Sequence, residues 1–178
     1  MTQQIATNML GFDVATQAEL DTEKSRIAAL EAVPSMVRVN TASGYGTTAT
    51  RLRRFANITN GVNGAVIQGT DITINDSAAG GTTFTVSVAG VYDMSWSDNF
   101  GAVDVMGITT NASAGTVDVR AAALGSVFAY SATSGANYED NVSVAVYLPA
   151  GTVIVCRTLL SGANGTSAPA AFSMTRCR

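Results

Sequence analysis

Hydrophobic and polar residues alternate along most of this chain after residue 35. The clearest case is FTVSVAGVYDMSWSD at 84–98, where the even positions from Phe84 to Trp96 are apolar or glycine and the odd positions are mostly polar. A period of two is typical of strands with one buried face, so this stretch predicts a strand pair or one long strand bent at Gly90. The residues predicted to form the core are Phe84, Tyr92, Met94, Trp96 and, near the C-terminus, Phe172.

Eight further segments show similar alternation, and stretches rich in Gly, Ser, Asn or Pro lie between them. They are MVRVN (36–40), DITIN (71–75), AVDVMGI (102–108), TVDVRA (116–121), SVFAYSA (126–132), VSVAVYL (142–148), TVIVCRTL (152–159) and AFSMTRC (171–177). The pattern predicts about eight to ten strands. Because no helical pattern separates them, parallel crossovers are excluded, which leaves an antiparallel sandwich, jelly roll or barrel.

The stretch at 14–33, VATQAELDTEKSRIAALEAV, has a helical pattern instead. Its interior consists mostly of good helix formers. Thr16 and Glu19 have the S/T-x-x-E spacing in which each side chain can bind the other residue's backbone amide. Pro34 follows and cannot continue the helix. The sequence therefore predicts one N-terminal helix ahead of the strands.

One narrow apolar seam runs along this helix, formed by Leu20, Ile27 and Leu30. A seam this thin buries little, and an isolated helix of this length is marginal in water. The helix is therefore expected to lie against copies of itself, another protein or its own domain. We interpret residues 1–34 as an arm and helix for attachment or trimerisation, and residues 35–178 as a β-sandwich domain.

The amino-acid composition favours a protein that contacts neighbouring molecules and argues against a membrane protein. Of the 178 residues, 47% are hydrophobic and only 13% are charged, about half the usual share of charge. Small, uncharged surfaces suit repeated contact with neighbouring molecules. The N-terminus lacks the basic and apolar regions of a signal peptide, and no run of about 20 apolar residues indicates a membrane span. We therefore expect a protein that is made in a cytoplasm and inserts into no membrane.

The charge distribution argues against a nucleic-acid partner. The net charge is -3, whereas nucleic-acid binding is driven by basic groups that neutralise phosphates. The one basic cluster is RLRRF at 51–55. Because arginine forms bidentate pairs with carboxylates, we interpret this cluster as a strand or loop that meets an acidic neighbour.

The sequence contains no histidine, which excludes Ser-His-Asp and Cys-His nucleophiles and zinc sites with histidine ligands. Carboxylate pairs for glycoside hydrolysis remain conceivable, but we interpret them as solvated surface groups. Calcium is left open at Asp98-Asn99 or at 139–141, where no motif sets the ligand spacing. The carboxylates concerned are Asp93, Asp98, Asp104, Glu139 and Asp140. We therefore predict no enzyme, no cofactor and no resident metal.

Three features of the strand order carry a family resemblance. They are an F-x-V-x-x-x-G-x-Y strand at Phe84, Val86, Gly90 and Tyr92, the hairpin VSVAVYLPAGTVIVCRT at 142–158, and a final strand that contains a phenylalanine. Over residues 36–178 the chain resembles the jelly roll of complement globular heads and tumour necrosis factor. The resemblance implies an all-β antiparallel sandwich in a compact homotrimer, with aromatic side chains along the threefold axis and both termini at one end.

The helical stretch resembles the stalk segments of phage fibre and decoration proteins. This resemblance implies a structural virion protein made in the host cytoplasm. It would be a trimeric capsid decoration or cement protein, attached through its N-terminal region to the major capsid protein or another virion protein. The alternative is the tip of a head or tail fibre that binds a glycan or protein receptor on the host surface. The short chain favours decoration, whereas Tyr45, Tyr130 and Tyr138, if clustered in outer loops, favour the receptor-binding tip through stacking on sugars.

Overall fold

The computed structural model describes residues 15–31, 34–41, 51–77, 80–100, 104–110, 117–132, 138–159 and 170–177. The chain divides into two compact units, residues 1–33 and residues 34–178. The first unit contains a helix, and the second contains every strand in the described ranges. We refer to the second unit as the β domain.

Helix α1, Gln17–Glu31, begins at the predicted capping box. The amide of Thr16 donates to Glu19 Oε2 at 2.6 Å, and the amide of Glu19 donates to Thr16 Oγ1 at 3.3 Å. The hydrogen bond from the Thr16 amide holds the pKa of the Glu19 carboxyl below its ordinary value. No helix in the described ranges is long and apolar enough to cross a membrane.

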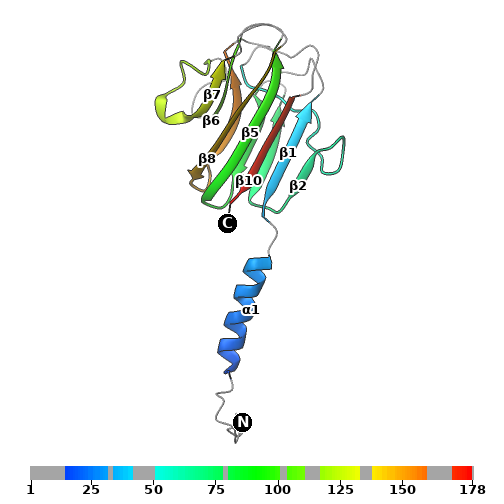
Figure 1. Cartoon of the computed structure of the whole chain (residues 1–178), viewed down its shortest axis with the longest axis vertical. Coiled ribbons are helices and arrows are strands. Elements are labelled where there is room, and N and C mark those ends of the chain that lie inside the picture. Colours follow the sequence, from blue (N-terminus) through cyan, green and yellow to red (C-terminus); the bar gives the residue numbers. More distant parts are fainter. Residues whose placement is uncertain are drawn as a thin grey trace, which may run out of the picture. The chain divides into compact units, whose positions relative to one another are not determined.

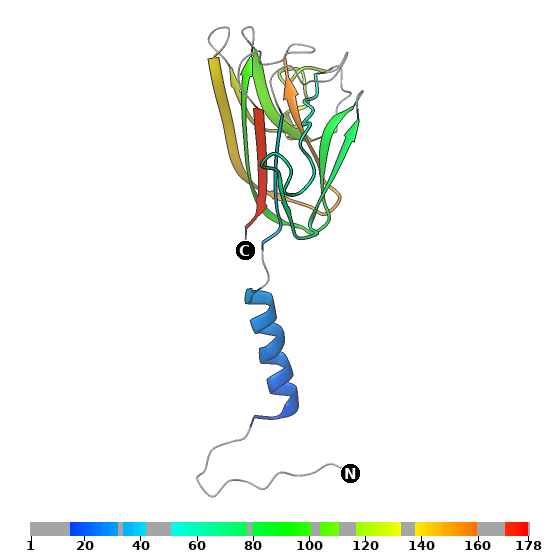
Figure 2. The same ribbon diagram turned by 90° about the vertical axis from the view of Figure 1, so that its right-hand side faces the viewer.

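Two five-stranded sheets packed face to face form the β domain (Figure 1), and Figure 2 shows them as two layers. All pairings between these strands are antiparallel. The first sheet has the order β2 (Val66–Gln68), β1 (Met36–Thr41), β10 (Ala170–Arg176), β5 (Gly90–Phe100) and β8 (Tyr138–Leu148). The second has the order β3 (Ile72–Ser77), β4 (Gly81–Val86), β9 (Val153–Thr158), β6 (Val105–Thr110) and β7 (Val127–Ala132). The predicted all-β antiparallel sandwich is confirmed.

The first and last strands lie side by side in the first sheet. β1 pairs with β10, and Met36 is opposite Thr175. The chain therefore enters and leaves the β domain at the same end (Figure 1).

The stretch 84–98 is neither a strand pair nor one bent strand. β4 ends at Val86 and β5 begins at Gly90, and these strands belong to different sheets. The chain crosses from one sheet to the other between them, so Val88 is exposed although its even position predicts burial. The alternation persists on both sides of the crossing because the two sheets face the same core.

The strand predicted at 116–121 is absent from the described residues 117–121, which form turns. Asp118 Oδ1 accepts hydrogen bonds from the amides of Arg120 at 2.7 Å and Ala121 at 2.9 Å. Such side-chain bonds to nearby amides compete with strand pairing. A short 3-10 helix, η1 (Leu124–Ser126), then leads into β7. Conversely, β2 is a strand that the sequence pattern did not predict, because β2 is too short to show alternation.

The core lies between the two sheets. All five residues predicted for it are there and fully buried, and the ring centroids of Phe84 and Phe172 lie 4.4 Å apart. Phe55 joins this aromatic group from an irregular segment, 6.2 Å from Phe172. Trp96 and Phe100 pack edge to face at 6.4 Å. Sequence analysis missed Phe55 because it lies outside any alternating stretch.

Candidate functional site

The arginine-rich segment 51–55 is built into the second sheet. The amide of Arg53 donates to the carbonyl of Cys156 at 2.8 Å, and the amide of Thr82 donates to the carbonyl of Arg53 at 3.0 Å. These bonds link the segment to β9 on one side and to the start of β4 on the other. The segment therefore carries three arginines into the body of the β domain.

Each of these arginines meets an aspartate, as predicted for the cluster. Arg51 Nη1 lies 3.2 Å from Asp118 Oδ2 in the turn segment before β7. Arg54 Nε donates to Asp76 Oδ1 on β3 at 3.0 Å. Both of these pairs are partly exposed, so each contributes little to stability by itself.

The third pair, Arg53 with Asp98, connects the two sheets inside the β domain. Arg53 Nη2 donates to Asp98 Oδ1 and Arg53 Nε lies beside Asp98 Oδ2, both at 2.7 Å, and the side chains are 2% and 0% exposed. Burial raises the pKa of Asp98 to about 6, although the charge of Arg53 acts in the opposite direction. Asp98 is therefore a buried ion-pair partner, and its interpretation as a solvated surface group is wrong.

The other carboxylates considered for catalysis or calcium lie in different surroundings. Asp104 is also buried, contrary to the solvated interpretation, and its Oδ1 accepts bonds from the amides of Val105 at 2.6 Å and Leu159 at 2.9 Å. Asp93 and Glu139 are exposed. Within the ranges that the structure covers, no three His, Cys, Asp or Glu side chains are grouped as a metal ion would require.

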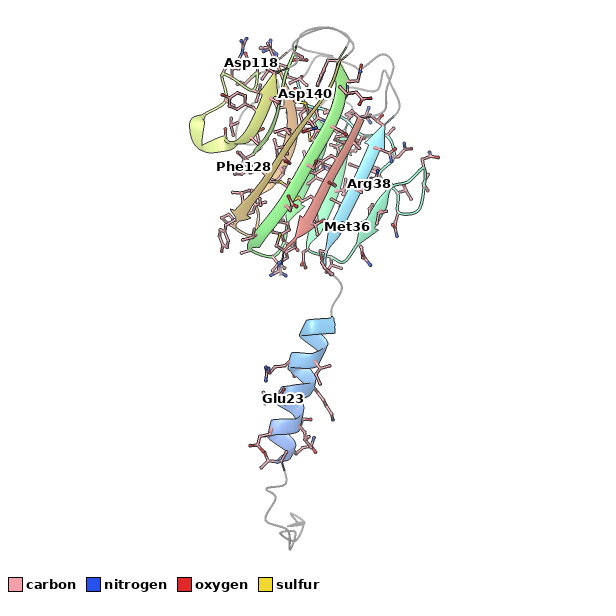
Figure 3. All side chains as sticks on the ribbon, viewed as in Figure 1. Glu23, Met36, Arg38, Asp118, Phe128 and Asp140 are labelled. Carbon is pink, nitrogen blue, oxygen red and sulfur yellow. The ribbon has the colours of Figure 1, made fainter. Side chains whose placement is uncertain are left out.

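A cleft of about 750 Å³ lies between β7 and β8, the strands that end the two sheets in the described part of the chain. We refer to it as the β7–β8 cleft. One wall is formed by Val119, Arg120, Ala122, Val127, Phe128, Ala129, Tyr130 and Ser131, and the other by Asn141, Val142 and Ser143. Figure 3 labels Phe128 on this side of the β domain. Sequence analysis could not find this cleft, because it is made by two strands from different sheets.

The turn segment 117–121, which forms part of one wall, is firmly held. Arg157, which is buried, donates from Nη1 to the carbonyl of Val117 at 2.6 Å. Asp118 closes the turn with its Oδ1 and pairs with Arg51 through its Oδ2. Burial acts to raise the pKa of Asp118, but the amide hydrogen bonds and the Arg51 charge outweigh it and hold that pKa below its ordinary value.

Val119 fixes the same wall by packing directly onto Gly107 of β6. A Cβ at Gly107 would lie 2.4 Å from Val119 Cγ2 and 3.0 Å from the carbonyl oxygen of Ala129. We therefore expect Gly107→Ala to displace the wall and to lower the free energy of unfolding by about 1–3 kcal/mol, as measured by urea titration. Gly125→Ala is the matched control, since a Cβ there meets no atom within 4 Å. Equal losses in the two variants would contradict this packing.

Exposed apolar side chains also lie outside the cleft, at Val62 and Val88, on α1 and on the outer face of the first sheet. On α1, Leu20 is 46% exposed and Ile27 is 51% exposed. Leu30 belongs to α1, but its side chain lies outside the described residues. On the outer face of the first sheet, Val91 and Tyr147 are direct partners across β5 and β8, and they are 43% and 62% exposed.

Of the three tyrosines considered for sugar stacking, only Tyr130 has a side chain within the described residues. Tyr130 is 69% exposed and lines the β7–β8 cleft, on an edge strand rather than in an outer loop. Tyr45 lies outside the described residues, and Tyr138 begins β8 with a side chain that also lies outside them. The structure therefore places one of the three at a concave surface.

Comparison with known proteins bears on the fold. No family model matches the chain, and no curated protein matches it. Among solved structures, the chain is similar to the globular domain of zebrafish complement 1qA protein, with a TM-score of 0.50 and 13% sequence identity, over 82% of this chain and 98% of that chain. The β domain has a complement-type jelly-roll fold. This finding confirms the fold implied by the sequence resemblance, and at 13% identity the similarity is one of fold alone.

Proposed function

We propose that this protein is a structural component of a phage virion. In this proposal it is a homotrimeric capsid decoration protein, attached through its N-terminal region to the major capsid protein or another virion protein. The division of the chain into a helical unit and a β domain supports the proposal. The resemblance of the helix to phage stalk segments supports it as well.

The exposed seam of α1 is the observation that carries the proposal. Leu20 and Ile27 are both about half exposed on a helix of 15 residues, a length that is marginal in water without a partner. Burial of each such side chain contributes about 1.5–3 kcal/mol. Three copies around an axis, or three copies seated on a capsid, multiply this gain.

The outer face of the first sheet supplies a second contact surface for self-association. Val91 and Tyr147 form an exposed apolar pair there. The next outward pair along these strands is Asp93 and Ala145, so the apolar contact is confined to the Val91–Tyr147 end of this face. The resemblance to complement globular heads favours three copies in a closed ring.

The experiment is to replace Leu20, Ile27 and Leu30 by serine. We expect the variant to keep the circular dichroism of the β domain, because the strands carry their own core. We expect it to lose attachment, so that it no longer co-sediments with emptied capsids of the phage that encodes the chain. Light scattering of the unmodified chain at micromolar concentration is expected to give the mass of a trimer.

Deletion of residues 1–33 is the companion variant and should give the same result. Global unfolding of either variant would show that the helix belongs to the core of the β domain. Unchanged capsid binding by the serine variant would place attachment in the β domain or in the arm before the helix. A stable monomer in light scattering would overturn the trimer.

The proposed role is not enzymatic. A histidine-based nucleophile is excluded by composition, and the buried carboxylate of Asp98 is engaged by Arg53. A receptor-binding fibre tip is the second candidate function. The exposed ring of Tyr130 beside the β7–β8 cleft favours it.

A further inference from the structure

We infer that the β7–β8 cleft is a binding site for a saccharide that carries a carboxylate group. The cleft volume of about 750 Å³ falls in the range of about 300–1,000 Å³ typical of small-ligand pockets. The inference goes beyond the structural role proposed above. It also uses none of the residues of the α1 seam.

The cleft combines an apolar floor with an aromatic rim. Phe128 is half-buried and packs against the core, and Val142 is almost fully buried. Tyr130 is exposed and belongs to the same lining. Apolar faces of sugar rings pack on such surfaces, and a tyrosine adds a hydroxyl group that can hydrogen-bond to the ligand.

Uncharged polar groups on both walls complement the hydroxyl groups of a sugar. Ser131 lies on the β7 side, and Asn141 and Ser143 lie on the β8 side, where both are exposed. An amide offers donors and an acceptor, and a hydroxyl offers one of each kind. Several such groups around an apolar floor are typical of sites that orient a small polar ligand.

Among the described residues of the lining, Arg120 is the one with a charged side chain. In the described part of the chain, no carboxylate forms an ion pair with it. The nearby Asp118 already uses Oδ2 for Arg51 and Oδ1 for the amides of Arg120 and Ala121. The charge of Arg120 acts on Asp118, but no hydrogen bond among the described residues occupies its guanidinium, which can therefore bind a ligand carboxylate through two hydrogen bonds.

The wall that carries Arg120 is ordered before any ligand binds. Its turn is closed by Asp118 and tied to the second sheet by Arg157. Val119 is buried against Gly107. Binding therefore requires little reorganisation of the backbone, which lowers its entropic cost.

The test uses the full chain and calorimetric titration with two pairs of probes. One pair is trigalacturonic acid and its fully methyl-esterified form, and the other is 3′-sialyllactose and lactose. We expect at least one acidic probe to bind. Its uncharged counterpart should bind about tenfold more weakly or worse, a difference of about 1.4 kcal/mol.

Matched variants assign the binding to the cleft. Arg120→Gln is expected to abolish the preference for the acid, whereas Arg38→Gln, on the exposed face of β1, should not. Tyr130→Ala is expected to lower the affinity for the acidic probe about tenfold. Val62→Ala, which truncates an exposed apolar side chain outside the cleft, should leave binding unchanged.

Two results would overturn the inference. One is that neither acidic probe binds at a probe concentration of about 10 mM, which would mean that any affinity is very weak. The other is a change of oligomeric mass in Arg120→Gln or Tyr130→Ala without any saccharide binding, which would show that another copy covers the cleft. The serine variant of the α1 seam separates this inference from the proposed function. It should bind the acidic probe normally even if it has lost capsid attachment.

Discussion

Replacing Arg53 by methionine is expected to destabilise the β domain by about 3–5 kcal/mol at pH 7, because it leaves a buried carboxylate without its partner. Methionine keeps much of the aliphatic stem, so the loss reports mainly on the charge. The carboxyl of Asp98 is fully buried and held at 2.7 Å by two nitrogens of Arg53. Chemical unfolding followed by circular dichroism measures the effect.

The pH dependence of this loss follows from the pKa of Asp98. Burial raises that pKa from an ordinary value of 3.8 to about 6. Between these values the folded state holds a proton that the unfolded state releases. The unmodified β domain therefore gains stability through this group as pH falls from 7 towards 4, by about 3 kcal/mol at most.

Loss of the Arg53 charge raises the pKa of Asp98 further. Arg53→Met should therefore recover more stability on acidification than the unmodified chain does. The difference in free energy of unfolding between the variant and the unmodified chain should therefore be about 1 kcal/mol smaller at pH 5 than at pH 7. A difference that is the same at both pH values would show that Asp98 is not the group responsible.

Arg51→Met provides the matched control. It makes the same substitution two residues away in the same segment, at a pair whose side chains are 30% and 21% exposed. Its expected cost is about 1 kcal/mol or less. If the two variants lose equal stability, the burial of the Arg53 pair has no energetic consequence.

Trp96→Ala is expected to lower the free energy of unfolding by about 3–5 kcal/mol, through lost burial and the cavity that remains. Trp96 is the largest fully buried side chain among the described residues. It packs edge to face on Phe100 and lies opposite Phe172 and Val142 on the strands beside it. For a domain of this size, the melting temperature should fall by about 10 °C or more.

Ser95→Ala is the control for this variant, because Ser95 precedes Trp96 on β5 and faces outwards. A surface change of this kind stays within about 0.5 kcal/mol. An unchanged melting temperature in Trp96→Ala would mean that the inward face of β5 has been assigned to the wrong set of residues.

Local patterns were enough to predict most elements of this fold. Alternation predicted the strands because one face of each is buried, and this holds whichever sheet the strand joins. The helix start was equally local, since Thr16 and Glu19 bind each other's backbone amides within one turn. A capping box can be predicted from the spacing of two residues in one segment, without knowledge of the rest of the chain.

For the buried carboxylate of Asp98, the alternating pattern indicated burial, but the charge of the residue led to the opposite prediction. Asp98 shares the even parity of Trp96, which is the buried face of β5. Its charge made a solvated position the natural interpretation. The partner that allows burial is Arg53, 45 residues earlier in the chain. A pairing over such a distance leaves no periodic signal in the sequence.

The sequence by itself determined most of the strand segments, the inward-facing apolar residues of the core, the start of the helix and the chemistries that the missing histidine excludes. The tertiary structure alone decided that β4 and β5 lie in different sheets, that Asp98 meets Arg53, and that Tyr130 shares a cleft with Asn141. The physical reason is the range of the interactions. Burial periodicity and helix caps act within a few residues, whereas sheet order, buried ion pairs and clefts depend on which distant strands become neighbours.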